Sequence, residues 1–195
     1  MIPAEMQETI IQYLQVFREL PDQDAQAIAN CFIRVTYKTG EYVSQPGEVA
    51  SKLFFINKGI LKVTLPDEED RDITYFFLKE GQLTGFLYSL YDEIPAEQGL
   101  QAACDTEIYV IAIEKLYGLF QQLPYLRELI DKIAYLSMVD MIKIKNSYLT
   151  GDALKKYELF LKTQPEIALH VMQIDIASYL GITPQSLSRI RKNIA

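Results

Sequence analysis

Apolar positions change their spacing along the chain, and each change predicts a different kind of element. In residues 5–17 and 22–30 they recur every three or four positions, as in amphipathic helices, and Pro21 separates the two segments. From about 31 to 113 they form short runs rich in Val, Ile, Tyr, Phe and Thr, separated by turn sequences such as KTGE, QPGE and NKG. Several short strands with such turns predict a sandwich or barrel.

The residues after these strands return to helical spacing. A short helix is predicted over 114–121, and a long one over 125–148. The long helix carries a narrow apolar seam of the coiled-coil type, for which a second copy of the chain is the simplest partner. The alternative is that the seam packs only on the chain's own β domain. The seam residues are Leu126, Leu129, Ile133 and Leu136.

A helix over 152–163 is followed by two short helices joined by a turn, in DIASYLGITPQSLSRIRK. Ile174, Ala177 and Leu180 are predicted to face inward on the first of the two. Gly181 lies where the chain must reverse, a position that favours positive φ. This is the layout of a helix-turn-helix, whose second helix lies in the major groove of DNA.

The second of these helices has an apolar inner side and a polar outer side. Thr183 is predicted to cap it, with Pro184 in the first helical position, while Leu187 and Ile190 face inward. The free N–H groups at its start could also hold a phosphate. The residues predicted to contact DNA are Thr183, Pro184, Gln185, Ser186, Ser188, Arg189, Arg191 and Lys192.

Gln185 and Arg189 are four residues apart and therefore share one face of that helix. Gln can pair with adenine and Arg with guanine in the major groove, so these two are predicted to contact bases. Arg191 and Lys192 are predicted to reach phosphates, which position a protein without reading the sequence.

The distribution of charge fits a chain with two functional parts. The net charge is −7, but residues 1–142 sum to −11 and residues 143–195 sum to +4. A split of this kind indicates that the C-terminal part could bind an anion. The alternative is that the uneven surface charge has no functional meaning.

Other classes of protein are disfavoured. Cys31 and Cys104 lack metal-ligand spacing, so no metal is predicted. No apolar run is long enough to span a membrane, and the first residues do not read as a secretory signal, so a cytoplasmic location is expected. The sequence shows no phosphate-binding loop, nucleophile elbow or zinc-protease motif, so no enzyme is predicted.

The segment IASYLGITPQSLSRIRK resembles the C-terminal helix-turn-helix of the Crp–Fnr transcription regulators, especially the short forms common in Bacteroidetes. Upstream, YKTGEYVSQPGEVASKLFFINKGILKV is similar to that family's cyclic-nucleotide-binding β-roll. By position, Pro184, Gln185 and Arg189 match the family's base- and phosphate-contacting sites.

The resemblance implies an α+β fold in three parts. These are an N-terminal double-stranded β-helix (a jelly-roll-like β-roll) over 1–122, a long dimerisation helix over 123–149, and a winged helix-turn-helix over 150–195. The segment QPEIALHVMQ, residues 164–173, is expected to supply the wing.

The family's cAMP-binding members carry a Gly-Glu pair and then an Arg-Ser or Arg-Thr pair, whose Glu holds the ribose and whose Arg holds the phosphate. An ungapped alignment places Gly85 and Phe86 at the first pair, and Ala96 and Glu97 at the second. An unpaired buried carboxylate beside a phosphate would cost several kcal/mol. We therefore expect that cAMP does not bind and that no cofactor is held.

The degenerate effector pocket comprises Gly85, Phe86, Leu87, Ala96 and Glu97. It is expected either to be filled by Phe86, Leu87 and Tyr88 or to accept an uncharged or apolar molecule. The family's iron–sulfur sensors need N-terminal cysteines and its haem sensors need a β-roll histidine. Neither is present, because the only histidine is His170.

Together these features predict a dimeric, sequence-specific DNA-binding transcription regulator. Its expected partners are double-stranded DNA, palindromic if the dimer is symmetric, and a second copy of the chain, with RNA polymerase as a further candidate and no membrane. The alternative is a ligand- or partner-binding module whose helical tail contacts protein rather than DNA.

Overall fold

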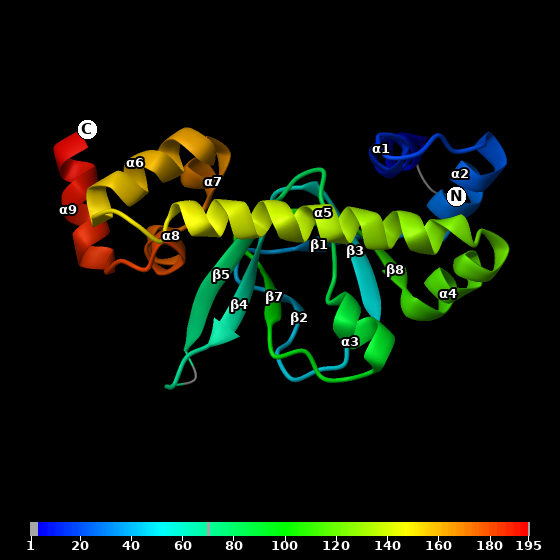
Figure 1. Cartoon of the computed structure of the whole chain (residues 1–195), viewed down its shortest axis with the longest axis horizontal. Coiled ribbons are helices and arrows are strands. Elements are labelled where there is room, and N and C mark those ends of the chain that lie inside the picture. The colour runs from blue at the N-terminus through cyan, green and yellow to red at the C-terminus, as the bar shows by residue number, and fades with distance from the viewer. Residues whose placement is uncertain (1–3, 70, 195) are drawn as a thin grey trace.

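The computed structural model describes residues 4–69 and 71–194 of the chain. A β-roll forms its middle, and one long helix, α5 (Tyr125–Ser147), runs along the roll (Figure 1). Helices from the N-terminal part lie at one end of α5, and helices from the C-terminal part lie at the other. The predicted α+β class and the long central helix are confirmed.

The roll consists of two four-stranded antiparallel sheets, as predicted for a jelly-roll-like fold. Their strand orders are β1-β8-β3-β6 and β2-β7-β4-β5, so each sheet joins strands that are distant in sequence. Each predicted run forms a strand, and β6 is additional because two residues are too few to show alternation. The strands are β1 (Ile33–Tyr37), β2 (Tyr42–Ser44), β3 (Lys52–Lys58), β4 (Ile60–Pro66), β5 (Asp72–Lys79), β6 (Leu83–Thr84), β7 (Gly99–Ala102) and β8 (Thr106–Ala112).

Apolar side chains fill the space between the two sheets. On β4, Leu61 and Val63 belong to this interior cluster, whereas the alternate residues Ile60 and Lys62 lie on the opposite face. The outward face of β4 is therefore also buried, and another element must cover it. The interior cluster comprises Val43, Phe54, Ile56, Leu61, Val63, Leu78, Leu100, Ala102, Ile108 and Val110.

The first half of α5 is covered by the chain itself. The predicted dimer seam is therefore wrong for three of its four residues, because they are buried in one apolar cluster with the N-terminal helices and α4. These three are Leu126, Leu129 and Ile133, whereas Leu136 is 39% exposed. The covering helices are α1 (Ala4–Gln15), α2 (Asp22–Ala29) and α4 (Ile113–Gln122).

The second half of α5 presents a different apolar face to solvent. Tyr135, Met138 and Ile142 recur at spacings of three and four residues, and all three are exposed. Periodicity alone cannot tell which of two apolar stripes is covered, since the covering helices are distant in sequence. The exposed stripe, with Leu136 as the one exposed residue of the predicted seam, is therefore apolar surface of α5 that the chain itself leaves uncovered.

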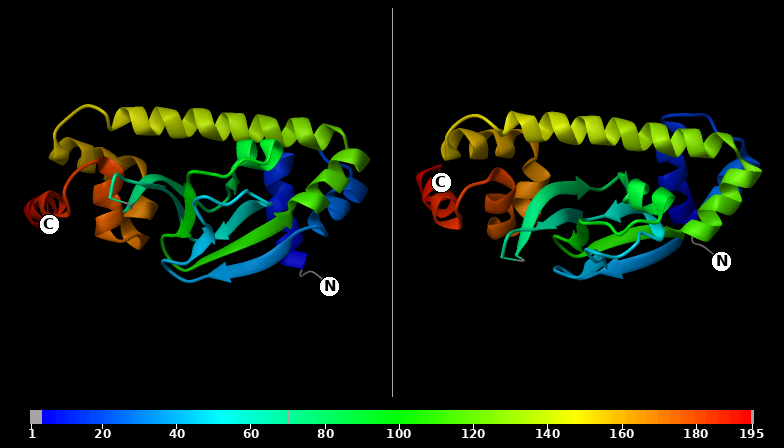
Figure 2. Two further views of the ribbon diagram at one scale, coloured as in Figure 1. Left: turned by 90° about the horizontal axis from the view of Figure 1, so that it is seen from below. Right: turned by 60° about the horizontal axis from the view of Figure 1, so that its bottom comes forward.

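Four helices form the C-terminal part, at the far end of α5 (Figure 2). The expected wing is wrong, because residues 165–170 form a helix and no strand follows β8 among the described residues. Pro165 occupies the first turn of this helix, where its missing N–H costs nothing, which favours a helix over a hairpin. The four helices are α6 (Ala153–Thr163), α7 (Pro165–His170), α8 (Gln173–Leu180) and α9 (Pro184–Ile194).

A further short helix, α3 (Leu87–Asp92), lies between β6 and β7. It ends at Glu93, which takes a left-handed conformation with φ at 56°. Six residues contain no full repeat of apolar spacing, so the sequence pattern does not reveal this helix. Across the described residues, no helix has both the length and the apolar character needed to cross a membrane.

Candidate nucleic-acid interface and effector pocket

The turn between α8 and α9 has the geometry expected from the sequence. Gly181 is left-handed, with φ at 64°, and its amide donates to the carbonyl oxygen of Ser178 at 3.1 Å. The amide of Ile182 donates to the carbonyl oxygen of Ala177 at 3.0 Å, so the turn satisfies two carbonyls at the end of α8. This defined turn fixes the direction in which α9 leaves.

Thr183 caps α9. Its hydroxyl oxygen accepts from the amide of Ser186 at 3.1 Å, and its O–H donates to Ser186 Oγ at 2.9 Å. Leu187 is fully buried, and Ile190 packs partly buried against the same cluster. The inner face of α9 is thereby anchored, which leaves its opposite face as the free one.

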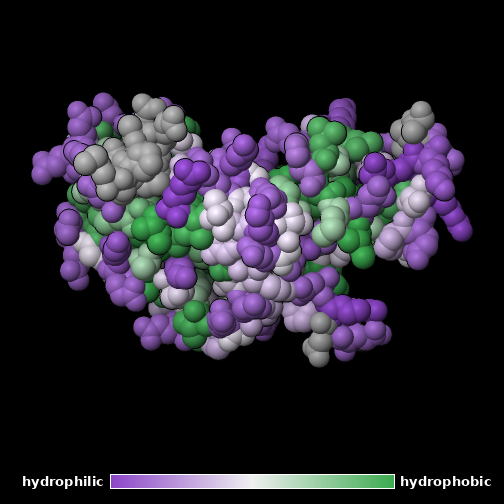
Figure 3. Space-filling view, turned by 180° about the vertical axis from the view of Figure 1, so that it is seen from behind, coloured by the Kyte–Doolittle hydropathy of each residue, from purple (hydrophilic) through white to green (hydrophobic). Residues whose placement is uncertain are grey.

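That free face of α9 is polar. Four of the predicted DNA-contacting side chains on it are exposed at helical spacing, and the tip of the molecule that carries α9 is mainly hydrophilic (Figure 3). Thr183 and Pro184 are exposed at the start of the helix, and Ser186 and Arg191 are partly exposed. The structure thus brings all eight predicted residues together on one helix and its cap. The four exposed residues are Gln185, Ser188, Arg189 and Lys192.

The inner side of α8 differs from the prediction. Ala177 and Leu180 are buried, but Ile174, expected to face inward, is 60% exposed. Ile176 and Tyr179 are buried instead, because α8 packs against the β-roll as well as against the neighbouring helices. The spacing of apolar residues in the sequence predicts one buried face of α8 and does not reveal that both the roll and the neighbouring helices cover this helix.

Polar contacts tie α8 to the outward face of the β4–β5 hairpin. Lys62 Nζ lies 2.6 Å from Asp175 Oδ1, and both side chains are at most 10% exposed. The backbone amide of Thr74 donates to Ser178 Oγ at 2.9 Å. Helix α8 is therefore docked on the roll and is not held by α5 alone.

Lys145 closes the same junction from α5. Its Nζ donates to the carbonyl oxygens of Tyr75 and Tyr179, each at 3.2 Å, and lies 4.8 Å from the centre of the Tyr179 ring. Burial, and then repulsion from Lys156, lowers the pKa of Lys145. Burial also raises the pKa of Tyr179 to about 12. A cation between two carbonyls and an aromatic ring fixes the end of α5 against both β5 and α8.

The predicted effector residues Gly85, Phe86 and Leu87 lie between β6 and the start of α3. Phe86 packs partly buried against the interior of the roll, whereas Leu87 packs against the cluster that contains the first half of α5. A Cβ on Gly85 would meet Leu53 Cδ1 at 3.0 Å, so this backbone passes close to β3. Phe86 thus occupies space beside the roll interior, as expected if its side chain fills the pocket.

Ala96 and Glu97 lie on the other side of that loop and face different surroundings. Ala96 is completely buried, and its amide donates to the carbonyl oxygen of Glu48 at 2.9 Å. Its carbonyl oxygen accepts from the amide of Gly47 at 2.7 Å. The Glu97 side chain is exposed instead of facing a closed pocket. Neither residue offers the cation that a cyclic phosphate needs.

The loop is closed by its own hydrogen bonds. Ser89 is buried, and its Oγ accepts from the amide of Ala50 at 2.8 Å and donates to the carbonyl oxygen of Ile94 at 2.5 Å. Tyr88, also expected to help fill the pocket, is instead 40% exposed and donates to Gln98 Oε1 at 2.6 Å. These bonds hold α3 in place.

Helix α3 is also joined to α5. Tyr91 Oη donates to Asp131 Oδ1 at 2.9 Å, and the Arg127 guanidinium lies 4.9 Å from the centre of the Tyr91 ring. Burial and the hydrogen bond to the Asp131 carboxylate raise the pKa of Tyr91. Helix α3 is therefore coupled directly to α5 through Tyr91.

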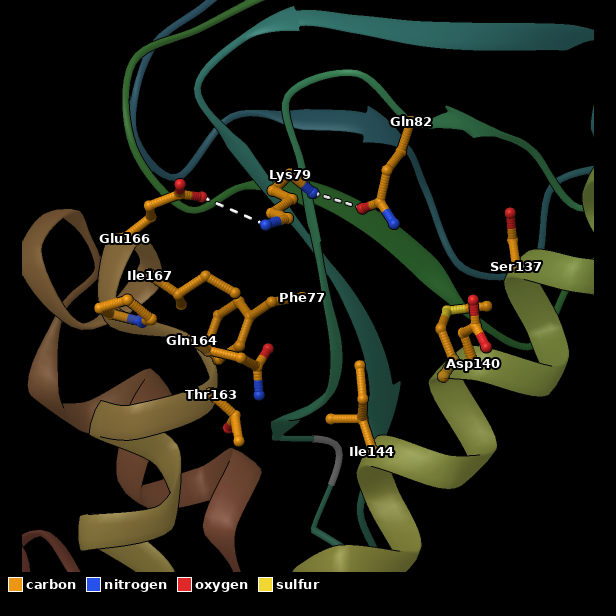
Figure 4. A pocket seen from close by; sticks show the side chains of 12 residues that line it. Phe77, Lys79, Gln82, Ser137, Asp140, Ile144, Thr163, Gln164, Glu166 and Ile167 are labelled. Carbon is orange, nitrogen blue, oxygen red and sulfur yellow. Dashed lines mark hydrogen bonds and ion pairs between the residues drawn. The ribbon is translucent and has the colours of Figure 1, made fainter. Parts of the chain in front are cut away.

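A cavity of about 160 Å³ opens where β5, α5 and the α6–α7 junction meet (Figure 4). Phe77, Ile144 and Gln164 line it, and Lys79 and Glu166 form an ion pair of 3.3 Å at its edge. Small-molecule sites usually measure about 300–1,000 Å³, so we assign no ligand to this cavity. In the described residues, no three metal-binding side chains come together as a group.

Comparison with known proteins places the roll in a family. Residues 34–123 match the family model of the cyclic nucleotide-binding domain. The β-roll is therefore similar in sequence to this domain. In this domain, the resemblance places the phosphate-contacting pair at Ala96 and Glu97.

Solved structures extend the likeness beyond this domain. A putative Crp/Fnr-family transcriptional regulator of Eubacterium rectale is 18% identical, with a TM-score of 0.70 over 94% of this chain and 87% of that one. The c-di-GMP-responsive global regulator CLP of Xanthomonas campestris is 18% identical, with a TM-score of 0.68 over 89% of this chain and 91% of that one. FixK2 of Bradyrhizobium japonicum is 18% identical, with a TM-score of 0.66 over 84% of each chain. The fold of the chain as a whole is therefore similar to that of these regulators.

Two features of this architecture are not evident from the sequence. One is the ion pair of Lys62 with Asp175. Lys62 lies in a mostly apolar strand, and this single charge is the only local hint of a partner elsewhere in the chain. The other is α3, which helps to close the effector loop. Both depend on contacts between segments far apart in the chain.

Proposed function

We propose that the chain is a homodimeric, sequence-specific DNA-binding transcription regulator. The observation that carries the proposal is the face of α9, where Gln185 and Arg189 are exposed four residues apart while Leu187 anchors the helix from behind. Gln and Arg are the side chains that pair bidentately with adenine and guanine. Arg191 and Lys192 follow on the same helix and suit phosphate contacts.

The proposed dimer forms through the free half of α5. Two recognition helices must lie about 34 Å apart to enter successive major grooves, so two copies are needed in a symmetric arrangement. The exposed stripe of Tyr135, Met138 and Ile142 gives α5 an apolar face that a second copy can cover. Double-stranded DNA of palindromic sequence is then the matching partner, and RNA polymerase is a further one.

The effector domain acts without cAMP in this proposal. Phe86 and Ala96 stand at the positions of the family's ribose-binding acid and phosphate-binding Arg, and the loop that carries them is closed by Ser89. The domain is then a non-enzymatic scaffold that sets the geometry of the two recognition helices. An effector, if one acts, is uncharged or apolar.

The test is selection of duplexes from a random library, followed by fluorescence anisotropy with the best palindrome and a scrambled version of it. We expect at least a 1,000-fold preference for the palindrome near physiological salt, about the lower end for specific binders, and a steep loss of affinity with rising salt. Equal affinity for both duplexes would exclude sequence-specific binding.

A second candidate is a module whose helical tail contacts another protein. The exposed apolar side chains of Leu169, Met172 and Ile174 at the α7–α8 connection favour it. Arg189→Ala separates the two functions, because it weakens DNA binding and leaves a protein contact through these apolar residues intact.

A further inference from the structure

We propose that Lys62 and Asp175 are positioning residues that hold the helix-turn-helix in one register on the β-roll. Lys62 lies in the middle of β4, and Asp175 lies in the first turn of α8, 113 positions later. Their Nζ and Oδ1 atoms are 2.6 Å apart, and the side chains are 9% and 10% exposed. The pair therefore joins two distant parts of the chain inside their contact surface.

The surroundings of the pair are apolar. The cluster at this junction contains Ile60 and Phe77 of the roll together with Ile176, Ala177 and Tyr179 of α8. Apolar surfaces of this kind attract one another without specifying direction, so they would tolerate a small slide of α8 along the hairpin. A buried ion pair tolerates no such slide, because either charge alone would be stranded away from water.

The pair is poorly explained as a stabilising contact. Asp175 Oδ2 is buried, and no hydrogen-bond partner for it is found among the described residues. Buried ion pairs with incomplete hydrogen bonding are often no more stabilising than apolar residues of the same size. What the pair adds is a single permitted alignment, supported by the bond from the Thr74 amide to Ser178 Oγ.

The alignment of α8 determines the placement of α9. The two helices are joined by a closed turn, and Leu187 of α9 is buried in the same cluster as Ala177. Gln185 and Arg189 remain exposed while α8 is docked, so docking orients the reading face without covering it. The consequence for DNA rests on the proposed function, whereas the register itself can be measured without DNA.

The first test uses hydrogen–deuterium exchange on the full chain without DNA. In Asp175→Asn and Lys62→Met, amides of α8 and of the β4–β5 hairpin should exchange about ten-fold faster, while those of α1 and α2 keep their protection. The matched control is Lys79→Met, which removes the exposed Lys79–Glu166 pair between the same two parts and should change exchange less than about two-fold.

The second test compares melting temperature with affinity for the selected duplex. The double variant Lys62→Met, Asp175→Leu removes both charges, so its melting temperature should equal or exceed that of the wild type. Its affinity for the duplex should nevertheless be about ten-fold weaker than that of the wild type, because the apolar pair no longer fixes the register of α8 on the roll. This variant also serves if a single substitution fails to fold.

Unchanged exchange in α8 of Asp175→Asn would overturn the inference. So would a double variant that regains DNA affinity together with its melting temperature, because the pair would then act through stability alone. If the wild type binds no duplex, the proposed function fails, and the exchange data alone decide whether the pair fixes the register.

Discussion

The amide of Ala96 donates to the carbonyl oxygen of Glu48 across 2.9 Å, and Ala96 has no exposed surface. The position at which the resemblance places the phosphate-binding Arg is thus part of closely packed backbone. The neighbouring loop is held by Ser89 in the same way. Backbone and side-chain hydrogen bonds within the chain therefore occupy this part of the β-roll.

We therefore predict that cAMP does not stabilise the protein. A ligand present at 100 times its Kd would stabilise the native state by about 2.7 kcal/mol, so millimolar cAMP should shift the melting temperature by less than about 1 °C. Differential scanning fluorimetry, with ATP as a control for general phosphate effects, measures this shift. A saturable rise with cAMP alone would contradict the prediction.

Substitution of Arg189 by Ala should weaken binding to the selected duplex by about 1–3 kcal/mol and relax the preference at one base position. Lys192→Ala should weaken binding to all duplexes alike and reduce the salt slope by about 1. Lys52→Ala, an exposed cation on β3, is the control and should have no effect. Anisotropy titrations at several salt concentrations give all three results.

Gly181 and Gly118 should respond to alanine in opposite directions. A Cβ would meet no atom within 4 Å at either residue, but Gly181 has φ at 64° and Gly118 lies inside α4. Gly181→Ala should cost about 1–2 kcal/mol of unfolding free energy, and Gly118→Ala should add about 0.5–1 kcal/mol. Urea denaturation measures both, and equal effects would show that backbone conformation is not the cause.

The two apolar stripes of α5 should separate folding from association. Met138→Glu with Ile142→Glu should shift the protein towards monomer in sedimentation experiments while its melting temperature changes little, because both residues are exposed. Leu129→Ala should instead destabilise the chain by about 2–5 kcal/mol and leave association intact while the protein is folded. If Leu129→Ala abolished the dimer and the double Glu variant did not, the dimer interface would lie at the predicted seam and not at the exposed stripe.

Tyr179 should make stability depend on alkaline pH. Its pKa is raised from the ordinary 10.0 to about 12, so the folded state keeps a proton that the unfolded state loses. Its contribution, on the order of 2 kcal/mol, is fully present below pH 10 and is lost as pH rises through about 12. Tyr179→Phe should reduce the fall in urea-unfolding free energy between pH 9 and pH 11.5. An equal fall in both proteins would contradict this assignment.

Local patterns explain how much of the fold could be predicted. The strands of the roll follow from short runs of β-branched and aromatic residues, and the turn before α9 follows from Gly181, Thr183 and Pro184. Each of these signals lies within a few residues, where backbone preference and capping decide the structure.

Two of the errors share one cause, which is contact between distant segments, and the third is local. Leu129 and Ile133 have the spacing of an interface, but α1 and α2, about 100 positions earlier, and the nearby α4 share their apolar cluster. Ile174 has the spacing of an inner residue, yet the roll approaches α8 from a different side. Residues 164–173 carry no clear local preference, so Pro165 decides for a helix.

Because α1 and α2 cover the first half of α5, a second copy of the chain in the proposed dimer can contact only the second half of α5, next to the C-terminal helices. Only the last turns of α5, up to Ser147, then separate the proposed dimer contact from the C-terminal helices. In the proposed dimer, a change in the angle at which two copies of α5 cross would alter the distance between their two α9 helices, and Lys145 fixes this end of α5 against β5 and α8.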